Sequence, residues 1–514
     1  MAVAPERRGT PTGSRRAAGT PWPARLVWGL LGCQLILATL YAVSELGSLP
    51  HYHDSNAYLE LARILRVDGH RGIAYPLFLA IADVLGSPSF LHVIEHAHPG
   101  APCTAPARIV VVQGLQFIAC GGALAYWLRT GRSVSPHDPN SRRGGALAFA
   151  AVCALVLTDP LVAHFALSVM PDALAMAASL TFCGALARLV LADPPRQRPS
   201  LTGLLVFLSF AFASLLRPEK KFVLLAATLA ATAAWPLVAR LAAVSLARFP
   251  ARAGLAVTLS LLAFAASLAT ERLAYRDYGR PGQKWIMLHA RVIFPHLGDV
   301  FGALPPDIQA AFSPSDVTFY DQHVLNPGPV MERVTGGDPD ASARLGVTIA
   351  RVAWQERKGQ IVFDTVKDGL ENAAPTPGFY TRLIALEALG MPGYRTFSRS
   401  DMLPWTRQLM AEHHPRLFGA SIVLSGLTFL ALASWLLARG VAALLDTGRR
   451  FPLRAAARTA LPWLPAVTFA LANGAAFALH ADAVSPRYNL TTHALVLALL
   501  YVSSIRGATQ EATS

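Results

Sequence analysis

Long apolar stretches dominate the chain and limit it to one class of fold. A helix needs about 20 apolar residues to cross the hydrocarbon core of a bilayer, and ten stretches approach or exceed that length. They are 26–46, 109–128, 145–167, 172–191, 201–216, 222–238, 253–270, 417–437, 459–479 and 490–504. Backbone polar groups in lipid must be satisfied within the segment, so such stretches form helices. The sequence therefore predicts an all-α polytopic membrane protein with about ten transmembrane helices.

The composition favours burial in lipid over a soluble fold. Only 15% of the residues are charged and 53% are hydrophobic, whereas an average soluble domain is about 25% charged. This balance excludes a disordered or collagen-like chain. The net charge of +14 would suggest a nucleic-acid ligand in a soluble protein. Here the basic residues gather between the apolar stretches, so we expect no nucleic-acid partner.

The basic residues fall in alternate gaps, and this pattern sets the expected orientation. Short loops rich in lysine and arginine stay in the cytoplasm. The basic segments are the tail 1–25, the gaps that begin near Arg129, Arg188, Arg240 and Arg439, and the tail 507–514 with the adjacent Arg506. We therefore expect both termini in the cytoplasm, with 26–46 retained as the first span.

Two long segments are expected on the extracytoplasmic face. The first, 47–108, contains the apolar run 73–85, which is too short to cross a membrane and predicts an interfacial or re-entrant helix. The second, 271–415, has nearly balanced charge and several Pro-Gly turn signals, and predicts a small extracytoplasmic domain. These segments separate an N-terminal transmembrane module of about seven helices, 26–270, from about three C-terminal helices in 416–506.

A polar cluster follows the first apolar stretch directly, with the sequence His-Tyr-His-Asp-Ser-Asn at 51–56. Residues 57–67 have helical spacing, which puts Asp54 at the N-terminal end of a surface helix. Asp54 is either the cap of that helix or a carboxylate available for chemistry. His51 and His53 could join it in binding a divalent metal ion, and solvated loop histidines are the alternative.

A second cluster, Arg217-Pro218-Glu219-Lys220-Lys221, forms a short turn on the expected extracytoplasmic face. Charge bias ordinarily keeps cations away from that face. Arginine binds phosphate bidentately and lysine attracts it as a point charge, so Arg217, Lys220 and Lys221 suit the phosphate or pyrophosphate of a membrane lipid. Basic side chains reaching out to anionic headgroups are the alternative.

Three further residues lie near the same face. Arg487, in Ser485-Pro486-Arg487-Tyr488, adds a cation in the last extracytoplasmic turn. Asp159 and Asp172 flank the turn between the third and fourth spans, and each is expected to cap a helix. Asp172 is the better functional candidate of these two acids.

In this order, the motifs resemble those of the GT-C superfamily of polytopic glycosyltransferases. The likeness is to the bacterial branch similar to protein mannosyltransferases and lipid A aminoarabinose transferases. It rests on Asp54 in a first loop that leads to Gly72-Ile73-Ala74-Tyr75-Pro76, on Ser168-Val169-Met170-Pro171-Asp172, on Leu216-Arg217-Pro218-Glu219, and on Arg487-Tyr488. It covers most of 26–238 and then only the last turn. The resemblance implies a bacterial inner or plasma membrane.

The resemblance also implies a reaction and roles for residues. Asp54 would be the catalytic base toward an acceptor hydroxyl. Arg217, Lys220, Lys221 and Arg487 would bind the phosphate of a polyprenyl-phosphate-linked sugar donor. His53 and Asp172 would lie on the acceptor or metal side, and a divalent metal ion is a possible cofactor. Transfer would invert the anomeric centre, with a glycan, a lipid or a protein as acceptor.

Two other classes of function stay open. A transporter or flippase of a lipid-linked sugar would need the same cations but no general base. Broken helices in paired halves would favour it, and the sequence shows no convincing halves. A noncatalytic membrane assembly subunit would use 271–415 to bind a partner. The sequence has no glycine-rich nucleotide loop, which suits a lipid-linked donor better than a nucleotide sugar.

Overall fold

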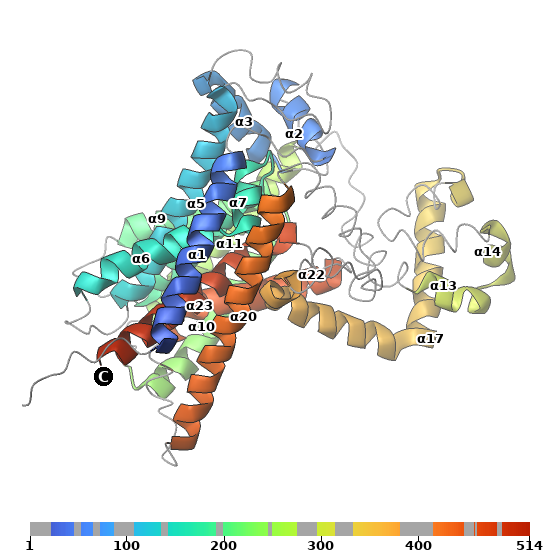
Figure 1. Ribbon diagram of the computed structural model, residues 1–514. Helices are drawn as coiled ribbons and strands as arrows, with labels where there is room; N and C mark the ends of the chain where they lie inside the picture. The colour runs from blue at the N-terminus through green and yellow to red at the C-terminus, as the bar shows by residue number, and fades with distance from the viewer. Residues whose placement is uncertain are drawn as a thin grey trace, which may run out of the picture.

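The computed structural model is a bundle of helices with a helical arm on one side (Figure 1). It describes residues 22–45, 53–64, 72–86, 107–134, 142–191, 199–244, 249–274, 296–313, 333–380, 415–446, 457, 460–480 and 486–513. Within these ranges all regular structure is helical. The predicted all-α class is confirmed to that extent.

Among the described residues, six helices are long and apolar enough to cross a membrane. Their spans lie in α5 (Ala107–Val134), α8 (Asp172–Leu191), α10 (Lys220–Ala242), α11 (Phe249–Ala274), α20 (Pro415–Asp446), and η6 (Leu461–Trp463) continued by α22 (Leu464–His480). Three shorter apolar segments lie in α1 (Trp22–Glu45), α9 (Pro199–Leu216) and α23 (Pro486–Thr513). The protein is therefore an integral membrane protein. The number of ten crossings stays a prediction.

The third predicted span is broken in two. Its halves, α6 (Arg142–Leu157) and α7 (Pro160–Leu167), are bent by 65° relative to each other. Pro160 cannot donate a backbone hydrogen bond, and the side chain of Asp159 accepts from the N–H groups of Leu161 and Val162. Asp159 thus starts a new helix at the break, which confirms its predicted role as a cap.

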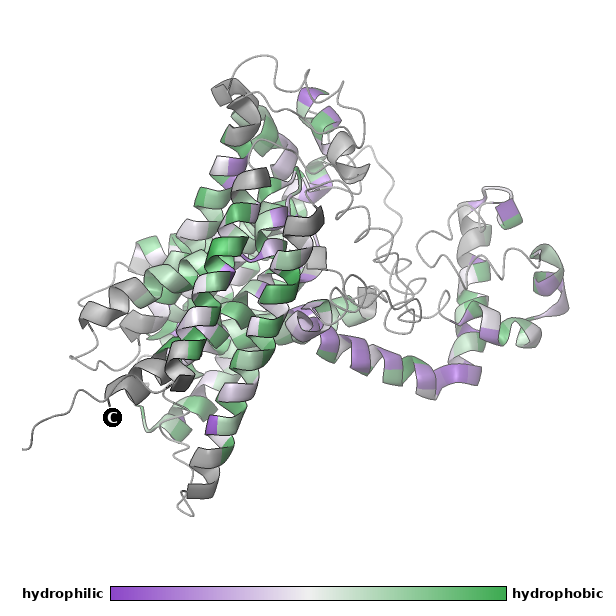
Figure 2. Cartoon of the chain, viewed as in Figure 1, coloured by the Kyte–Doolittle hydropathy of each residue, from purple (hydrophilic) through white to green (hydrophobic). Residues whose placement is uncertain are grey.

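Helix α8 is the centre of the bundle. Nearly all its side chains are buried, and it packs against α5, α9, α11, α22 and α23. Large hydrophobic side chains such as Ile36, Leu237 and Leu471 are exposed on the outer helices. Figure 2 shows that hydrophobic residues, coloured green, extend along the length of the bundle. Exposed apolar side chains around a buried centre are expected when lipid surrounds a bundle.

Two short helices, α2 (His53–Ile64) and α3 (Ala74–Gly86), lie together at one end of the bundle (Figure 1). We call this the α3 end. Helix α3 matches the short apolar run predicted at 73–85. Helix α2 starts four residues before the predicted 57 and includes Asp54 in its first turn, so the sequence pattern placed its start too late.

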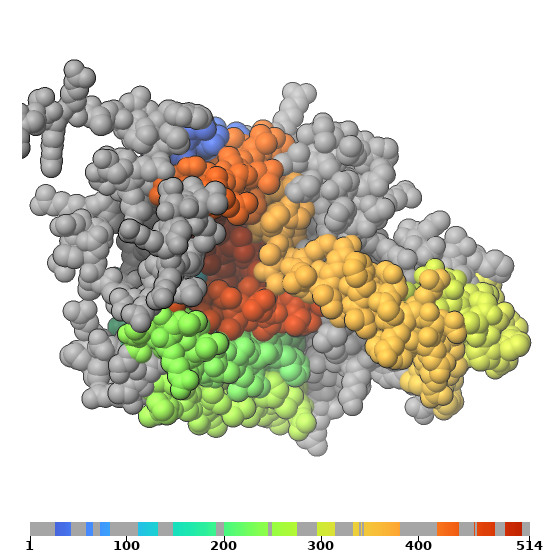
Figure 3. Space-filling model, turned by 90° about the horizontal axis from the view of Figure 1, so that it is seen from below, coloured from blue at the N-terminus to red at the C-terminus, as the bar shows by residue number. Residues whose placement is uncertain are grey.

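The arm comprises α13 (Leu297–Val300), η4 (Phe301–Ala303), α14 (Pro306–Ala311) and the long α17 (Pro339–Ala373), which is kinked at Arg357. A small apolar cluster of Leu297, Leu304, Phe312, Ile349 and Ala350 joins α13 and α14 to the first part of α17. Between this cluster and the bundle, α17 is largely hydrophilic (Figure 2). Figure 3 shows it running from the bundle out to α13 and α14.

The last part of α17 packs against α22 and belongs to the bundle. A Cβ atom on Gly474 would lie 2.5 Å from the carbonyl oxygen of Gly369, so the two backbones touch. Phe379 and Tyr380, in the helical stretch 375–380 that follows, are also buried. The predicted extracytoplasmic domain 271–415 therefore does not stand apart from the transmembrane helices in its described C-terminal part.

Candidate functional site

Three segments that are far apart in the sequence meet at the α3 end. Their side chains form one buried cluster of Tyr58 and Leu59 from α2, Tyr75 and Leu79 from α3, Val169, Met170 and Leu174 around the start of α8, and Leu216 at the end of α9. The segments that lead to Tyr75, to Asp172 and to Arg217 are the ones that carried the family resemblance. The fold thus brings three of the four sequence motifs together.

Gly72 allows α3 to approach α9 this closely. A Cβ atom at position 72 would lie 2.3 Å from the carbonyl oxygen of Leu216 and 2.4 Å from that of Leu215. Neither neighbour is a flexible side chain, so only glycine fits without moving the backbone. This contact joins the first-loop helices to the turn that carries Arg217.

Tyr75 is a fixed hydrogen-bond donor at the centre of the α3 end. Its ring is fully buried, lies edge-on to Tyr58 at 5.2 Å between centroids, and its hydroxyl donates to Gln116 Oε1 at 3.1 Å. Burial raises the pKa of Tyr75 well above its usual range, and the charges of Tyr58 and Asp172 add to this effect. The phenol therefore stays protonated.

Asp172 and Arg217 form a buried ion pair. The Nη2 atom of Arg217 lies 2.5 Å from Oδ1 of Asp172, and both side chains are largely excluded from solvent. Asp172 is in the first turn of α8, where a carboxylate is also favoured by the helix dipole. The pair fixes the orientation of the guanidinium at the α3 end.

Lys220 points in another direction, toward α22. Its ammonium donates to Asn473 Oδ1 at 2.9 Å and lies over the rings of Phe469 and Phe477 at 5.6 and 5.4 Å. Asn473 donates to Asn489 at 2.7 Å, and Asn489 donates to Asn372 at 2.5 Å. This chain of buried amides links Lys220 to α22, α23 and α17. Asn489 lies two residues after Arg487, so the fourth motif is also connected to this region.

Lys221 has a structural partner instead. Its ammonium pairs with Glu271 of α11, and the two side chains are only 1% and 2% exposed. The three predicted phosphate ligands Arg217, Lys220 and Lys221 are thus all buried, and the structure turns the two lysines toward different helices. Burial also contradicts the alternative that these side chains extend to lipid headgroups. Lys221 therefore forms a buried ion pair, and its role as a phosphate ligand stays a prediction.

The remaining predicted site residues are His51, His53, Asp54 and Arg487. His53 and Asp54 belong to the first turn of α2, and Arg487 to the first turn of α23, but their side chains, like His51, lie outside the described residues. Their convergence with Arg217 stays a prediction. Among the residues that the structure describes, no group of three or more His, Cys, Asp or Glu side chains is arranged to hold a metal ion.

Sequence reasoning missed a second polar centre inside the bundle. Asp159 contacts Tyr380 and His493 as well as capping α7, and all three side chains are fully buried or nearly so. Tyr380 comes from the stretch after α17 and His493 from α23. A lone acid before proline and a histidine within an apolar helix were the signals available. Neither showed that a segment from 271–415 would reach them.

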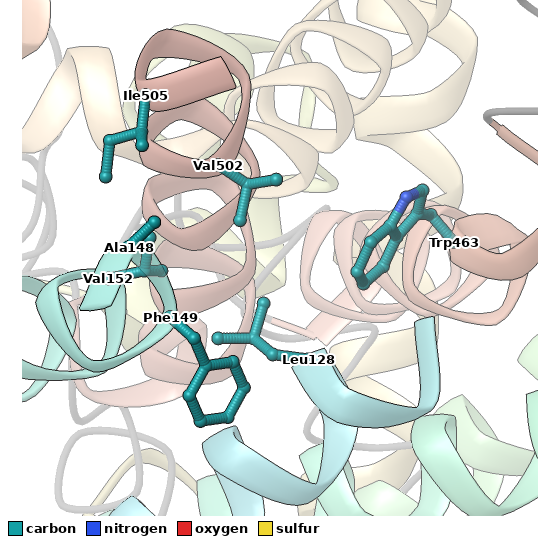
Figure 4. A pocket seen from close by; sticks show the side chains of 7 residues that line it. All are labelled: Leu128, Ala148, Phe149, Val152, Trp463, Val502 and Ile505. Atoms are coloured by element: carbon teal, nitrogen blue, oxygen red, sulfur yellow. The ribbon is translucent and has the colours of Figure 1, made fainter. Parts of the chain in front are cut away.

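An apolar cavity lies away from the α3 end. It is lined by Leu128 of α5, Ala148, Phe149 and Val152 of α6, Trp463 of η6, and Val502 and Ile505 of α23 (Figure 4). Val112 of α5 belongs to the α3-end cluster, and the 16 residues from there to Leu128 correspond to about 24 Å of helix. The cavity therefore takes no part in the site around Tyr75.

Comparison with known proteins gives no match, whether with protein-family models, with curated proteins or with solved structures.

Proposed function

We propose that the protein is a membrane glycosyltransferase of the GT-C type. It would transfer a sugar from a polyprenyl-phosphate donor to an acceptor at the extracytoplasmic face, with inversion of the anomeric centre. The orientation follows the distribution of basic residues described above, and the location is a bacterial inner or plasma membrane. The α3 end is then extracytoplasmic.

One observation carries this proposal. Tyr75, Asp172 and Arg217 come from three separate segments and lie around one buried cluster, with α2 packed on it through Tyr58. Position 54 is four residues before Tyr58, one helical turn away on the same face of α2. The side chain of Asp54 lies outside the described residues, so its place in the proposed reaction rests on the resemblance and on the experiment below.

The residues suit the chemistry in the following way. Breaking the bond between sugar and phosphate leaves negative charge on the phosphate, and fixed cations stabilise that charge. Arg217 is oriented by Asp172 and Lys220 by Asn473, so the protein holds both cations before the donor arrives. Arg487 would add a third. Asp54 would take the proton of the acceptor hydroxyl while the hydroxyl oxygen attacks the anomeric carbon.

The test is sugar transfer by the purified full-length protein in liposomes. The donors are labelled polyprenyl-phosphate mannose and polyprenyl-phosphate aminoarabinose, and the readout is release of polyprenyl phosphate together with transfer of label. Asp54→Asn should lower the rate by about 10²–10⁴-fold, the usual contribution of a general base. Glu60→Gln is the matched control, because Glu60 is an exposed acid on the same helix. Equal rates for the wild type and Asp54→Asn would refute the assignment.

One observation favours transport as a second candidate function. The span formed by α6 and α7 is broken at Asp159, and broken helices are common at the substrate sites of transporters. The liposome experiment separates the two functions. A transporter moves the lipid-linked sugar across the bilayer without releasing polyprenyl phosphate, and Asp54→Asn leaves that movement intact.

A further inference from the structure

The polar centre around Asp159 has no role in the proposed transfer reaction. Asp159 and His493 are fully buried, and the Nε2 atom of His493 lies 3.0 Å from Oδ1 of Asp159. Both lie within apolar segments, at the break between α6 and α7 and in α23. Ionisable groups in such surroundings are costly unless paired, and they commonly mark a function.

Hydrogen bonds to Asp159 favour its ionised form. The carboxylate accepts from the backbone N–H groups of Leu161 and Val162 and from the hydroxyl of Tyr380. A protonated acid would lose one of these acceptor positions. His493 therefore presents an Nε2–H to Asp159, and any exchangeable proton of the pair belongs on the other ring nitrogen.

That other nitrogen faces a hydroxyl. The Nδ1 atom of His493 lies 3.0 Å from Oγ1 of Thr376. A hydroxyl can donate or accept. When His493 is neutral, Thr376 donates to Nδ1, and when His493 is charged, Nδ1–H donates to Thr376. Rotation of one hydroxyl hydrogen is enough to satisfy either state, without movement of a heavy atom.

We propose that Asp159 and His493 form a proton-binding site inside the bundle, with Thr376 as the group that adapts to its occupancy. Binding takes one proton from water onto Nδ1 and changes the pair from a net charge of −1 to zero. In the described part of the chain, the other titratable groups near the pair are Tyr380, whose ring lies 5.6 Å from that of His493, and Tyr501 on α23. Tyr380 donates a hydrogen bond to the carboxylate of Asp159 and so stabilises the anionic state.

The proton-binding site includes residues of the segment that follows the arm helix α17. Thr376 and Tyr380 belong to the stretch 375–380, which follows α17 directly. Uptake of a proton reverses the hydrogen bond to Thr376 and strengthens the attraction between His493 and Asp159. Proton binding therefore reverses the donor and acceptor of the hydrogen bond between the stretch 375–380 and α23, independently of any sugar transfer.

The test is ¹⁵N NMR of the full-length protein in lipid nanodiscs, labelled at histidine and purified without a histidine tag. The chain has 15 histidines, and the spectrum of His493→Gln identifies the signal of His493. We expect Nδ1 of His493 to gain a proton as the pH is lowered across the range in which the protein stays folded. His164→Gln, which removes another buried histidine, should leave that titration unchanged.

Three variants distinguish proton binding from a purely structural contact. Asp159→Asn removes the facing charge and should lower the titration midpoint by about one pH unit or more. Thr376→Val keeps the shape of the side chain but removes the hydroxyl that accepts from Nδ1–H, so it should also lower the titration midpoint of His493. Tyr380→Phe removes a hydrogen bond to the carboxylate of Asp159, which makes the carboxylate more basic, so this variant should raise the titration midpoint of His493. A loss of packing alone would not move the midpoint in opposite directions.

Two results would overturn the proposal. One is a His493 signal that keeps a single tautomer without a change of protonation across the pH range. The other is a midpoint that is the same in Thr376→Val and Tyr380→Phe as in the wild type, and these two variants suffice if Asp159→Asn does not fold. Sugar transfer is not measured in this experiment, so its outcome is separate from that of the proposed function.

Discussion

The guanidinium of Arg217 lies 2.5 Å from the carboxylate of Asp172, and this contact joins the turn between α9 and α10 to the first turn of α8. Removing one partner of a buried ion pair leaves an uncompensated charge, which costs about 3–5 kcal/mol. Arg217→Gln and Asp172→Asn should each destabilise the protein by an amount of this order. The double variant should lose much less than the sum.

The measurement is a double-mutant cycle on thermal unfolding in nanodiscs. Losses that simply add up would show that the two side chains contribute independently, contrary to the ion pair.

Gly72 should not tolerate a larger residue. In Gly72→Ala, the new Cβ atom would overlap the carbonyl oxygens of Leu215 and Leu216, and overpacking of this kind costs about 1–3 kcal/mol. We expect α2 and α3 to lose protection in hydrogen exchange while the rest of the bundle keeps it. Gly114→Ala in α5 is the control, because no atom lies within 4 Å of its added Cβ. Unchanged protection of α3 in Gly72→Ala would contradict the contact with α9.

Lys220 and Lys221 should differ in function although they are neighbours. Lys221→Gln alone leaves the buried Glu271 without its cation, so it should lower stability, and adding Glu271→Gln should restore most of the loss. The double variant should keep sugar transfer near the wild-type rate. Lys220→Gln should instead lower transfer by about 10²–10³-fold, as expected when a group that stabilises developing charge is removed. The reverse order of effects on transfer would show that Lys221, and not Lys220, binds the donor.

Tyr75 should make the protein less stable at high pH. Its pKa is raised in the folded protein, so above pH 10, the usual value for tyrosine, the unfolded chain loses a proton that the folded protein keeps. The folded state then binds more protons than the unfolded state, and stability falls as the pH rises. Thermal unfolding at pH 8 and pH 11 should show a smaller fall for Tyr75→Phe than for the wild type. An equal fall would mean that Tyr75 ionises without unfolding.

Much of the bundle could be predicted from the sequence because lipid imposes a simple rule. Every apolar stretch from 26–46 to 490–504 is helical wherever the structure describes it, apart from the break at 158–159, since a chain in lipid must satisfy its own backbone. The short run at 73–85 was also recognised as a separate helix, because its length excludes a crossing. The break at Asp159 was visible only as an acid before proline.

The candidate site was predicted less completely. Tyr75, Asp172 and Arg217 belong to three of the motifs that carried the resemblance, and they lie around one cluster. The predicted convergence of Asp54 and Arg487 with Arg217 stays a prediction. The partners of the two lysines depend on which face of α10 meets α11 and which meets α22. Residues 220 and 221 differ by about 100° around the helix, and the sequence alone does not say which helix each meets.

The contribution of α17 could not be predicted for a different reason. Its charged and apolar residues have the composition of a soluble segment, and nothing in 271–415 marks Asn372, Thr376 or Tyr380 as core residues. They are buried because Gly369 and Gly474 let α17 and α22 touch. Such a contact depends on two glycines more than 100 residues apart, so it follows from the tertiary structure.

Photocrosslinking with a polyprenyl phosphate is the most direct test of a donor site at the α3 end. The probe carries a photoreactive group next to the phosphate, and the full-length protein is labelled in liposomes and mapped by mass spectrometry. We predict saturable labelling of α2 and of the turn 217–221, which unlabelled polyprenyl phosphate displaces and which Lys220→Gln weakens. Labelling confined to the cavity around Phe149 and Trp463, or labelling that unlabelled lipid does not displace, would contradict the account.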